Sequence, residues 1–301
     1  MEIKVYFCRR RKNVIKKVEI ITSTQNPKVK HVLTLQQKSA ERRKSGLFVV
    51  EGRRELMHCI EAGFTVETVY VCPTVCVGTE PMPSLPLGVR MFEVSSEVYD
   101  KMAYRGSTEG VVAVVRARKL TLEELIKDDS QSTTHNSNPT PQTSNLNPHP
   151  PLLVVVEHVE KPGNLGAVLR SADAAGADGV VVCDPLTDLY NPNLIRASVG
   201  AIFSVPCVAC SSEECIEFLK RKGIQILTAQ LQDSSLYYDT DMQRPTAIVM
   251  GTEATGLTPQ WREAADAHIR IPMLGRVDSL NVSVSAAILL FEAVRQRMDK
   301  R

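Results

Sequence analysis

The segment that most constrains the fold is Leu152–Val159, a stretch dominated by leucine and valine. Such a run is typical of a strand that is buried on both faces of a sheet. Further strand-like segments follow at 179–183, 224–229, 246–250 and 267–272, with helical patterns between several of them. This alternation predicts a mostly parallel α/β sheet with helices on both faces, which binds ligands at the carboxyl ends of its strands.

The last helix is predicted to begin near Val282. Apolar residues recur from there at helical spacing, at 286, 289, 290, 293 and 294. Ser279 stands where an N-cap is expected, and Asn281 and Ser283 fall in the first turn, where unpaired N–H groups are available to a ligand. Taken alone, this stretch fits a simple helix cap as well as it fits a ligand site.

The first part of the chain is predicted to form a second α/β unit. A helix is expected from Asn26-Pro27 to Gly46, followed by strands and helices that alternate up to residue 116. Residues 128–151 are almost entirely polar or proline, which indicates a flexible linker. The expected organisation is a basic extension at 1–20, a domain at 21–118, a linker at 119–151 and a domain at 152–301.

Positive charge is concentrated at the start of the chain. Residues 1–54 hold 15 Lys and Arg against 4 Asp and Glu, whereas the remaining residues hold 21 against 30. A basic region on an otherwise mildly acidic protein indicates a polyanionic partner such as RNA. The candidate RNA-binding residues in this region are Lys28, Lys30, Arg42, Arg43, Lys44, Arg53 and Arg54.

Neither a disulfide framework nor a metal site is expected from the eight cysteines. Cys207 and Cys210 form a CxxC pair with Cys215 nearby, but no histidine follows at zinc-ligand spacing. The better interpretation is reduced, mostly buried thiols. The sequence also has no apolar run of membrane-spanning length and no secretory signal, so we expect a cytoplasmic protein.

Three loops follow predicted strands and carry polar residues. The first contains Asn164, Gly166 and Arg170, and its glycines would let backbone approach a ligand. It matches neither a dinucleotide fingerprint nor a phosphate-binding loop, and Arg170 could instead pair with Asp173 one turn on. The second loop places Glu253 between two glycines, Gly251 and Gly256; the third runs from Ile271 to Asn281.

Together these loops resemble, in order, the three motifs of the SpoU/TrmH family of RNA ribose 2′-O-methyltransferases. The first motif matches at Asn164, Gly166 and Arg170, and the second at Gly251, Glu253 and Gly256-Leu257. The third matches at Ile271–Met273 and at 279–283. The unit before the linker is similar to the L30e-like substrate-binding domain that many family members carry.

The resemblance implies a trefoil-knotted SPOUT parallel-sheet domain, a homodimer and S-adenosylmethionine as the cofactor. It implies catalytic or supporting roles for Arg170, Asn164, Glu253, Ser279 and Asn281. The residues that it implies around the cofactor are Gly251, Glu253, Ile271, Met273, Leu274, Gly275, Ser279, Leu280 and Asn281. Arg170 is either the general base, as proposed in the family, or a bidentate electrostatic stabiliser; the guanidinium pKa above about 12 makes the first role awkward.

The leading functional hypothesis is methylation of a ribose 2′-hydroxyl in large-subunit ribosomal RNA. An L30e-like domain with a basic start suits a structured RNA. The alternatives are tRNA 2′-O-methylation and a non-catalytic RNA- or ribosome-binding protein on the same fold. Loss of Arg170, Asn281 or the Gly251–Glu253 segment would have favoured the non-catalytic protein, and all of them are present.

Overall fold

The computed structural model describes residues 18–76, 84–103, 109–126, 149–252 and 255–298. The chain divides into two compact units. The first ends at Arg118 and also takes in Tyr190–Pro192, and the second holds the rest from Lys119 onward. Within the described residues, no helix is both long and apolar enough to cross a membrane.

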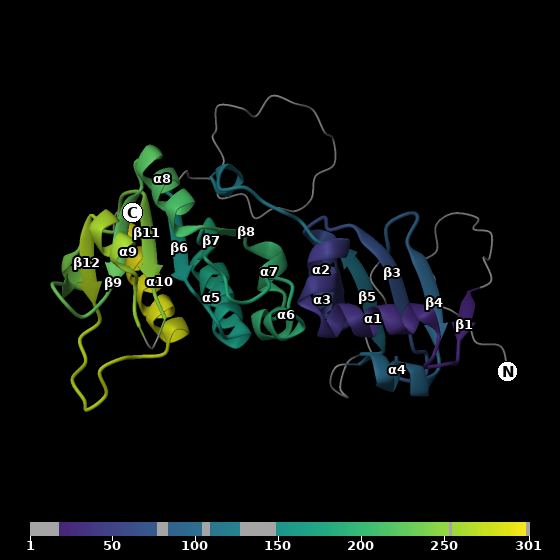
Figure 1. The fold of residues 1–301 in the computed structure, drawn as a ribbon. Coiled ribbons are helices and arrows are strands. Elements are labelled where there is room, and N and C mark those ends of the chain that lie inside the picture. Colours follow the sequence, from purple (N-terminus) through teal and green to yellow (C-terminus); the bar gives the residue numbers. More distant parts are fainter. Residues whose placement is uncertain (1–17, 77–83, 104–108, 127–148, 253–254, 299–301) are drawn as a thin grey trace, which may run out of the picture. The chain divides into compact units, whose positions relative to one another are not determined.

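The first unit is built on a five-stranded mixed sheet in the order β1-β4-β3-β5-β2 (Figure 1). Strands β1, β4 and β3 are parallel to one another, and β5 is antiparallel to both of its neighbours. The strands are β1 (Glu19–Ile21), β2 (Leu47–Glu51), β3 (Val66–Val71), β4 (Arg90–Val94) and β5 (Val111–Arg116). A core of valines, leucines and aromatic residues packs between the sheet and its helices.

The helices of the first unit are α1 (Pro27–Gln37), α2 (Ser39–Ser45), α3 (Arg53–Glu61) and α4 (Ser96–Met102). The single helix expected up to Gly46 is wrong, because Lys38 is extended at φ −114° and ψ 107° and divides it. The break exposes the last carbonyls of α1. Arg42 satisfies two of them, since its Nη1 donates to Leu35 O at 2.5 Å and to Gln36 O at 3.1 Å.

The second unit is built on a seven-stranded sheet in the order β10-β12-β9-β11-β6-β7-β8. Every described strand pair in it is parallel, which confirms the predicted sheet type. The strands are β6 (Leu152–Glu157), β7 (Gly179–Cys183), β8 (Cys207–Cys210), β9 (Gln225–Ala229), β10 (Ser235–Leu236), β11 (Thr246–Met250) and β12 (Ala267–Arg270). The edge strands β8 and β10 were not expected from the sequence.

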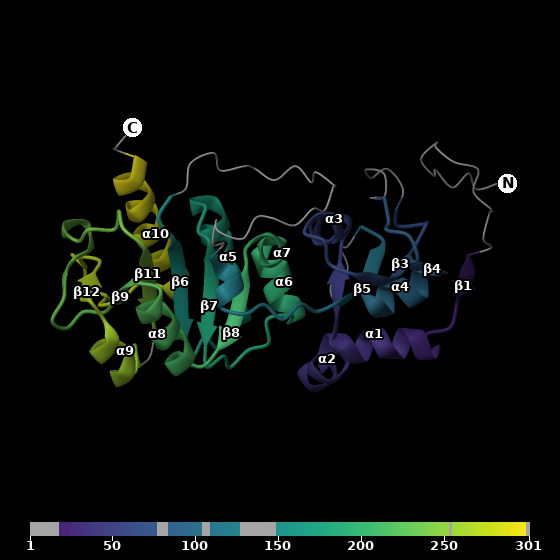
Figure 2. The ribbon, with the colours of Figure 1, turned by 90° about the horizontal axis from the view of Figure 1, so that it is seen from above.

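Helices cover both faces of this sheet, as predicted. Helices α5 (Pro162–Ala175) and α10 (Val282–Met298) pack against each other on one face, and α8 (Ser212–Arg221) and α9 (Pro259–Ala264) pack on the other (Figure 2). The prediction of one continuous helix at 192–202 is wrong. The segment is divided into α6 (Pro192–Ser198) and α7 (Ala201–Ser204) by Val199 and Gly200, both at positive φ.

The first residues of the predicted linker belong to the second unit. A 3₁₀ helix, η1 (Glu123–Leu125), follows Arg118, and Leu125 is buried in the core beneath β7 and β8. Arg221 on α8 forms an ion pair with Glu123 at 2.6 Å. The expected linker at 119–151 is therefore ordered over its start, and residues 127–148 lie outside the described part of the chain. Most of the expected extension at 1–20 also lies outside it, and its last two residues begin β1.

Candidate active site

Three loops leave the same edge of the seven-stranded sheet. They follow β6, β11 and β12, and because these strands are parallel their carboxyl ends meet at one edge. The loops are the three polar segments singled out in the sequence. Asn164 lies in the first turn of α5, while Gly251 follows β11 and Ile271 follows β12.

Asn164 and Asn281 join the first and third loops. Asn281 Nδ2 donates a hydrogen bond of 3.2 Å to Asn164 Oδ1, across 117 residues of sequence. The other end of the Asn281 amide is fixed as well, because its Oδ1 accepts from the backbone N–H and from the hydroxyl of Ser283, at 2.9 and 2.6 Å. Two of the predicted site residues are thus in direct contact.

The N-cap of α10 differs from the sequence-based expectation. The helix begins at Val282, and Asn281 accepts the N–H of Ser283 as a capping residue does. The prediction of Ser279 as the cap is therefore wrong. Ser279 lies two residues before the capping position and is exposed. Asn281 therefore has two roles, because it caps the start of α10 and also contacts Asn164.

Arg170 is exposed on α5, in the second turn after Asn164. No described residue forms a hydrogen bond or ion pair with its guanidinium. The pairing with Asp173 that the sequence allowed is not formed, and the Asp173 carboxylate accepts the Ser204 hydroxyl at 2.8 Å. Its five N–H donors therefore face solvent in the described chain. Glu253, the other charged residue of the predicted site, lies outside the described residues.

The loop after β11 folds tightly back on itself. Thr252 and Gly256 form an isolated antiparallel bridge, and the Thr252 hydroxyl contacts the hydroxyl of Thr255 at 2.8 Å. A Cβ on Gly251 would overlap the backbone of Gly256 and Leu257. Gly256 itself has φ of +68°, a conformation that favours glycine. Both glycines are therefore required by the shape of this loop.

Gly166 serves a different purpose from the one expected. Sequence reasoning assigned it to close approach of a ligand, but it is buried within α5. A Cβ there would lie 2.8 Å from the backbone nitrogen of Ser198, at the end of α6. The residue is glycine because α5 and α6 pack closely.

The third loop offers apolar surface and backbone groups. Leu274 is 96% exposed, Gly275 is exposed, and Ile271, Met273 and Leu280 are half-buried. Within the described chain, the backbone N–H and C=O groups of residues 272–280 form no hydrogen bonds with one another or with their neighbours. Exposed leucine and free backbone donors are what an apolar ligand with a polar edge requires.

Glu157 is a site residue that sequence reasoning missed. It ends β6, is 1% exposed, and its two carboxylate oxygens accept the N–H and the hydroxyl of Thr258 at 2.9 and 2.6 Å. The Ser212 hydroxyl lies 3.3 Å from the same carboxylate and 2.7 Å from the closer Asp184 carboxylate, and it accepts the Trp261 Nε1–H at 3.0 Å. The Glu157 carboxylate therefore anchors the end of the loop that begins at Gly251. The available signal was an acidic residue at the end of an apolar run.

Replacing Glu157 with glutamine should destabilise the second unit. The glutamine side chain has only one acceptor oxygen, so its NH₂ group would face either the N–H or the hydroxyl of Thr258. That buried donor would then have no acceptor, which lowers the free energy of unfolding by about 2 kcal/mol. Urea unfolding should show that loss in the free energy of unfolding, whereas Glu263→Gln on the exposed face of α9 should leave it unchanged. An unfolding midpoint equal to that of the parent would contradict this anchoring role.

Comparison with known proteins follows the same division of the chain. Residues 151–291 match the SpoU rRNA Methylase family, and residues 26–113 match the MRM3-like substrate binding domain. An uncharacterized tRNA/rRNA methyltransferase of Synechocystis is 31% identical over 283 residues, which cover 92% of this chain and 94% of that relative. The chain belongs to the SpoU rRNA methylase family.

Solved structures in this family share the whole architecture. An RNA 2′-O ribose methyltransferase is 36% identical, with a TM-score of 0.71 over 93% of this chain and 99% of the other. An rRNA methyltransferase from Sinorhizobium meliloti, solved with S-adenosylmethionine bound, is 28% identical with a TM-score of 0.75 and similar coverage. The SPOUT fold class of the second unit and the substrate-binding nature of the first are therefore confirmed.

Proposed function

We propose that this member of the SpoU family transfers a methyl group from S-adenosylmethionine to a ribose 2′-hydroxyl of ribosomal RNA. The observation that carries the proposal is the Asn164–Asn281 contact at the carboxyl edge of the parallel sheet, with Arg170 exposed on the same helix as Asn164. Relatives named as 23S rRNA 2′-O-methyltransferases support the substrate. One from Bacillus subtilis, RlmP, is 26% identical and covers 90% of this chain.

The residues of the second and third loops suit the cofactor. Gly251 and the free backbone groups of 272–280 would contact its polar edges, and Met273, Leu274 and Leu280 would cover its apolar surface. Gly275, Ile271, Ser279 and Asn281 complete this proposed set, with Glu253 included from the sequence. The bound cofactor supplies an electrophilic methyl group on a positively charged sulfur.

The chemical task of the protein is to make the ribose oxygen nucleophilic. In this transfer the ribose oxygen would form its bond to the methyl carbon while the carbon–sulfur bond breaks with its electron pair staying on sulfur, and the hydroxyl proton would pass to a solvent water. The guanidinium of Arg170 would hold the adjacent phosphate bidentately and stabilise negative charge that develops on the oxygen. Asn164 and Asn281 would fix the ribose in line with the transferred methyl group. Methyl transfer of this kind needs no metal ion.

RNA would be held by the basic residues of the first unit. Lys30, Arg43, Lys44 and Arg54 are exposed, and Lys28 is half-buried beside Glu19 at 2.8 Å. Arg42 and Arg53 are buried and donate to backbone carbonyls, so these two candidates are reassigned to holding the fold.

The double variant Arg43→Ala/Lys44→Ala should weaken RNA binding without affecting the fold. Each lost phosphate contact lowers the salt dependence of the binding constant, so the slope of log K against log salt should fall by about 2. Fluorescence anisotropy with a ribosomal RNA fragment at several salt concentrations measures this slope. Lys220→Ala is the control, because Lys220 is exposed on α8 of the second unit, and it should leave the slope unchanged. An unaltered slope in the double variant would exclude these residues from the RNA interface.

A homodimer is also part of the proposal. Val284, Phe291 and Met298 lie seven residues apart along α10 and are 47, 48 and 61% exposed. This spacing places them on one face of the helix, where they form an apolar stripe that a second copy of the chain would cover.

Phe291→Glu should dissociate that dimer. A buried interface carboxylate facing apolar side chains costs at least about 2 kcal/mol, so the dimer dissociation constant should rise roughly 30-fold. Sedimentation velocity measures the shift, and Leu186→Glu, which alters an exposed leucine in the segment after β7, is the control. The stripe is not the interface if both variants sediment like the parent protein.

Ribose-methylation mapping of total RNA, with and without the gene, tests the substrate. The proposal predicts loss of one 2′-O-methyl mark in large-subunit ribosomal RNA. A lost tRNA mark would keep the chemistry and reject the substrate, and no lost mark with intact RNA binding would favour the non-catalytic alternative. The cytoplasmic location expected from the sequence stays a prediction.

A further inference from the structure

Three cysteines of the second unit gather outside the site described above. Cys183 ends β7, Cys210 ends β8, and Cys215 lies on α8. Their three Sγ atoms all lie within 4.8 Å of one another, the one such group of metal-binding side chains among the described residues. Cys183 and Cys215 are buried, and Cys210 is half-buried.

The fold itself assembles this group. Cys183 and Cys210 are register partners in the parallel ladder of β7 and β8, so their side chains leave the same face of the sheet. Helix α8 packs on that face and contributes Cys215 from its first turn, beside the Ser211 capping box. All three cysteines belong to one cluster with Phe218 and Leu219. Their positions are therefore set by a ladder, a capped helix and a packed core.

We propose that the Cys183, Cys210 and Cys215 thiolates bind a soft d¹⁰ cation, with Zn²⁺ as the ion to test. Thiolates select soft cations, and zinc is bound by cysteine sulfur at about 2.3 Å, which places tetrahedral sulfur ligands about 3.8 Å apart. Sulfur atoms that already lie within 4.8 Å reach this spacing through small side-chain movements.

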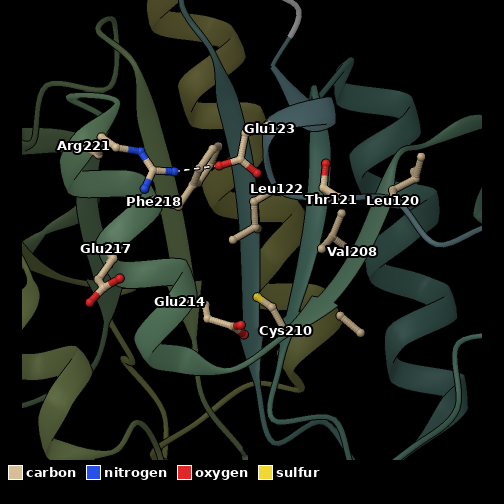
Figure 3. A pocket seen from close by; sticks show the side chains of 11 residues that line it. Leu120, Thr121, Leu122, Glu123, Val208, Cys210, Glu214, Glu217, Phe218 and Arg221 are labelled. Carbon is tan, nitrogen blue, oxygen red and sulfur yellow. Dashed lines mark hydrogen bonds and ion pairs between the residues drawn. The ribbon is translucent and has the colours of Figure 1, made fainter.

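The surroundings favour a cation and supply a route to it. Cys210 lines an open pocket together with Glu214, Phe218 and Arg221 (Figure 3), so solvent can provide a fourth ligand. The Glu214 carboxylate is held at this wall by the Ser211 N–H and hydroxyl, at 2.8 and 2.9 Å.

This site differs from what the cysteine spacing suggested. The sequence draws attention to Cys207 and Cys210 as a CxxC pair, and it predicts no metal. In the structure Cys207 is at the opposite end of β8 and is not part of the cluster, and its place is taken by Cys183 from 27 residues upstream of Cys210. The partner could not be identified without knowing that β7 and β8 pair.

Zinc content of the purified full-length protein tests the proposal directly. We expect about one zinc per chain by plasma mass spectrometry after purification under reducing conditions, because three thiolate ligands from a packed part of the fold hold the metal tightly. Cys210→Ser and Cys215→Ser should each lower the retained zinc at least about tenfold, since a lost ligand weakens the site strongly. Cys207→Ser should retain the full amount.

A measurement on the unaltered protein guards against misfolded variants. X-ray absorption at the zinc edge should show three sulfur neighbours at about 2.3 Å and one lighter atom. The proposal would be overturned if the purified protein held no zinc and bound none when zinc was added. It would also be overturned if the absorption spectrum showed no sulfur ligand, or if two of the three cysteines formed a disulfide in the reduced preparation. None of these readouts depends on methyl transfer, so the metal site and the proposed function are tested separately.

Discussion

Arg170→Ala is expected to lower kcat for methyl transfer by about 10²- to 10³-fold, or roughly 3–4 kcal/mol of transition-state stabilisation. The loss should fall on the chemical step because the guanidinium stabilises charge that appears on the ribose oxygen only as the bond to the methyl group forms. Stability should be unchanged, since Arg170 is exposed and bonds to no described residue. Single-turnover kinetics with saturating cofactor and RNA separates this step from binding.

Two further variants sharpen the Arg170 experiment. Arg170→Lys keeps the positive charge but removes the bidentate fork, so it should recover only part of the rate. Arg196→Ala, an exposed arginine on α6, should leave the rate unaffected. If Arg170→Ala turned over as fast as the parent protein, Arg170 would have no catalytic role.

Gly251→Ala is expected to weaken cofactor binding by about 5- to 150-fold, which corresponds to the 1–3 kcal/mol cost of forcing an extra methyl group into a packed site. The added Cβ would overlap the backbone of Gly256 and Leu257, neither of which can rotate away as a side chain would. The turn between Thr252 and Gly256 must therefore open, which moves the loop that we propose to contact the cofactor. Isothermal titration with S-adenosylmethionine measures the effect.

Gly163→Ala is the matched control for Gly251→Ala. Gly163 lies in the first turn of α5, close to Asn164, but a Cβ there meets nothing within 4 Å. Alanine favours a helix over glycine by about 0.5–1 kcal/mol, so this variant should be as stable as the parent or more so, with unchanged cofactor affinity. Equal affinities for all three proteins would show that the loop after β11 does not shape the cofactor site.

The fold could be predicted from the sequence where a continuous apolar segment forms a central strand. The segments at 152–157 and 246–250 are fully buried central strands. Strands that are covered on both faces are continuously apolar, so their sequence alone indicates this position. Strand β8 could not be predicted, because in this short edge strand only Val208 is fully buried. The break at Lys38 was equally hidden, because neither glycine nor proline stands there. Gly200 was an available signal for the break after α6, but the positive φ of Val199 was not, because β-branched residues rarely adopt it.

The sequence identified residues of the candidate site but not most of the contacts between them. The three motifs identified Asn164 and Asn281, which meet in the structure. The helix start near Val282 was predicted correctly, but the cap was placed at Ser279 because serine is a good capping residue, whereas Asn281 caps the helix. Glu157 was missed because its partner Thr258 is 101 residues away, and a contact of that range leaves no local pattern. For the same reason Cys183 could not be paired with Cys210.

The most direct test of the central claim is methyl transfer by the purified protein. Ribosomal RNA isolated without its methyl marks would be incubated with isotopically labelled S-adenosylmethionine, digested to nucleosides and analysed by mass spectrometry. The prediction is one labelled 2′-O-methyl nucleoside per RNA, formed by the parent protein and at least about 10²-fold more slowly by Arg170→Ala. Label on a base instead of a ribose, or no label with bound cofactor and bound RNA, would contradict it.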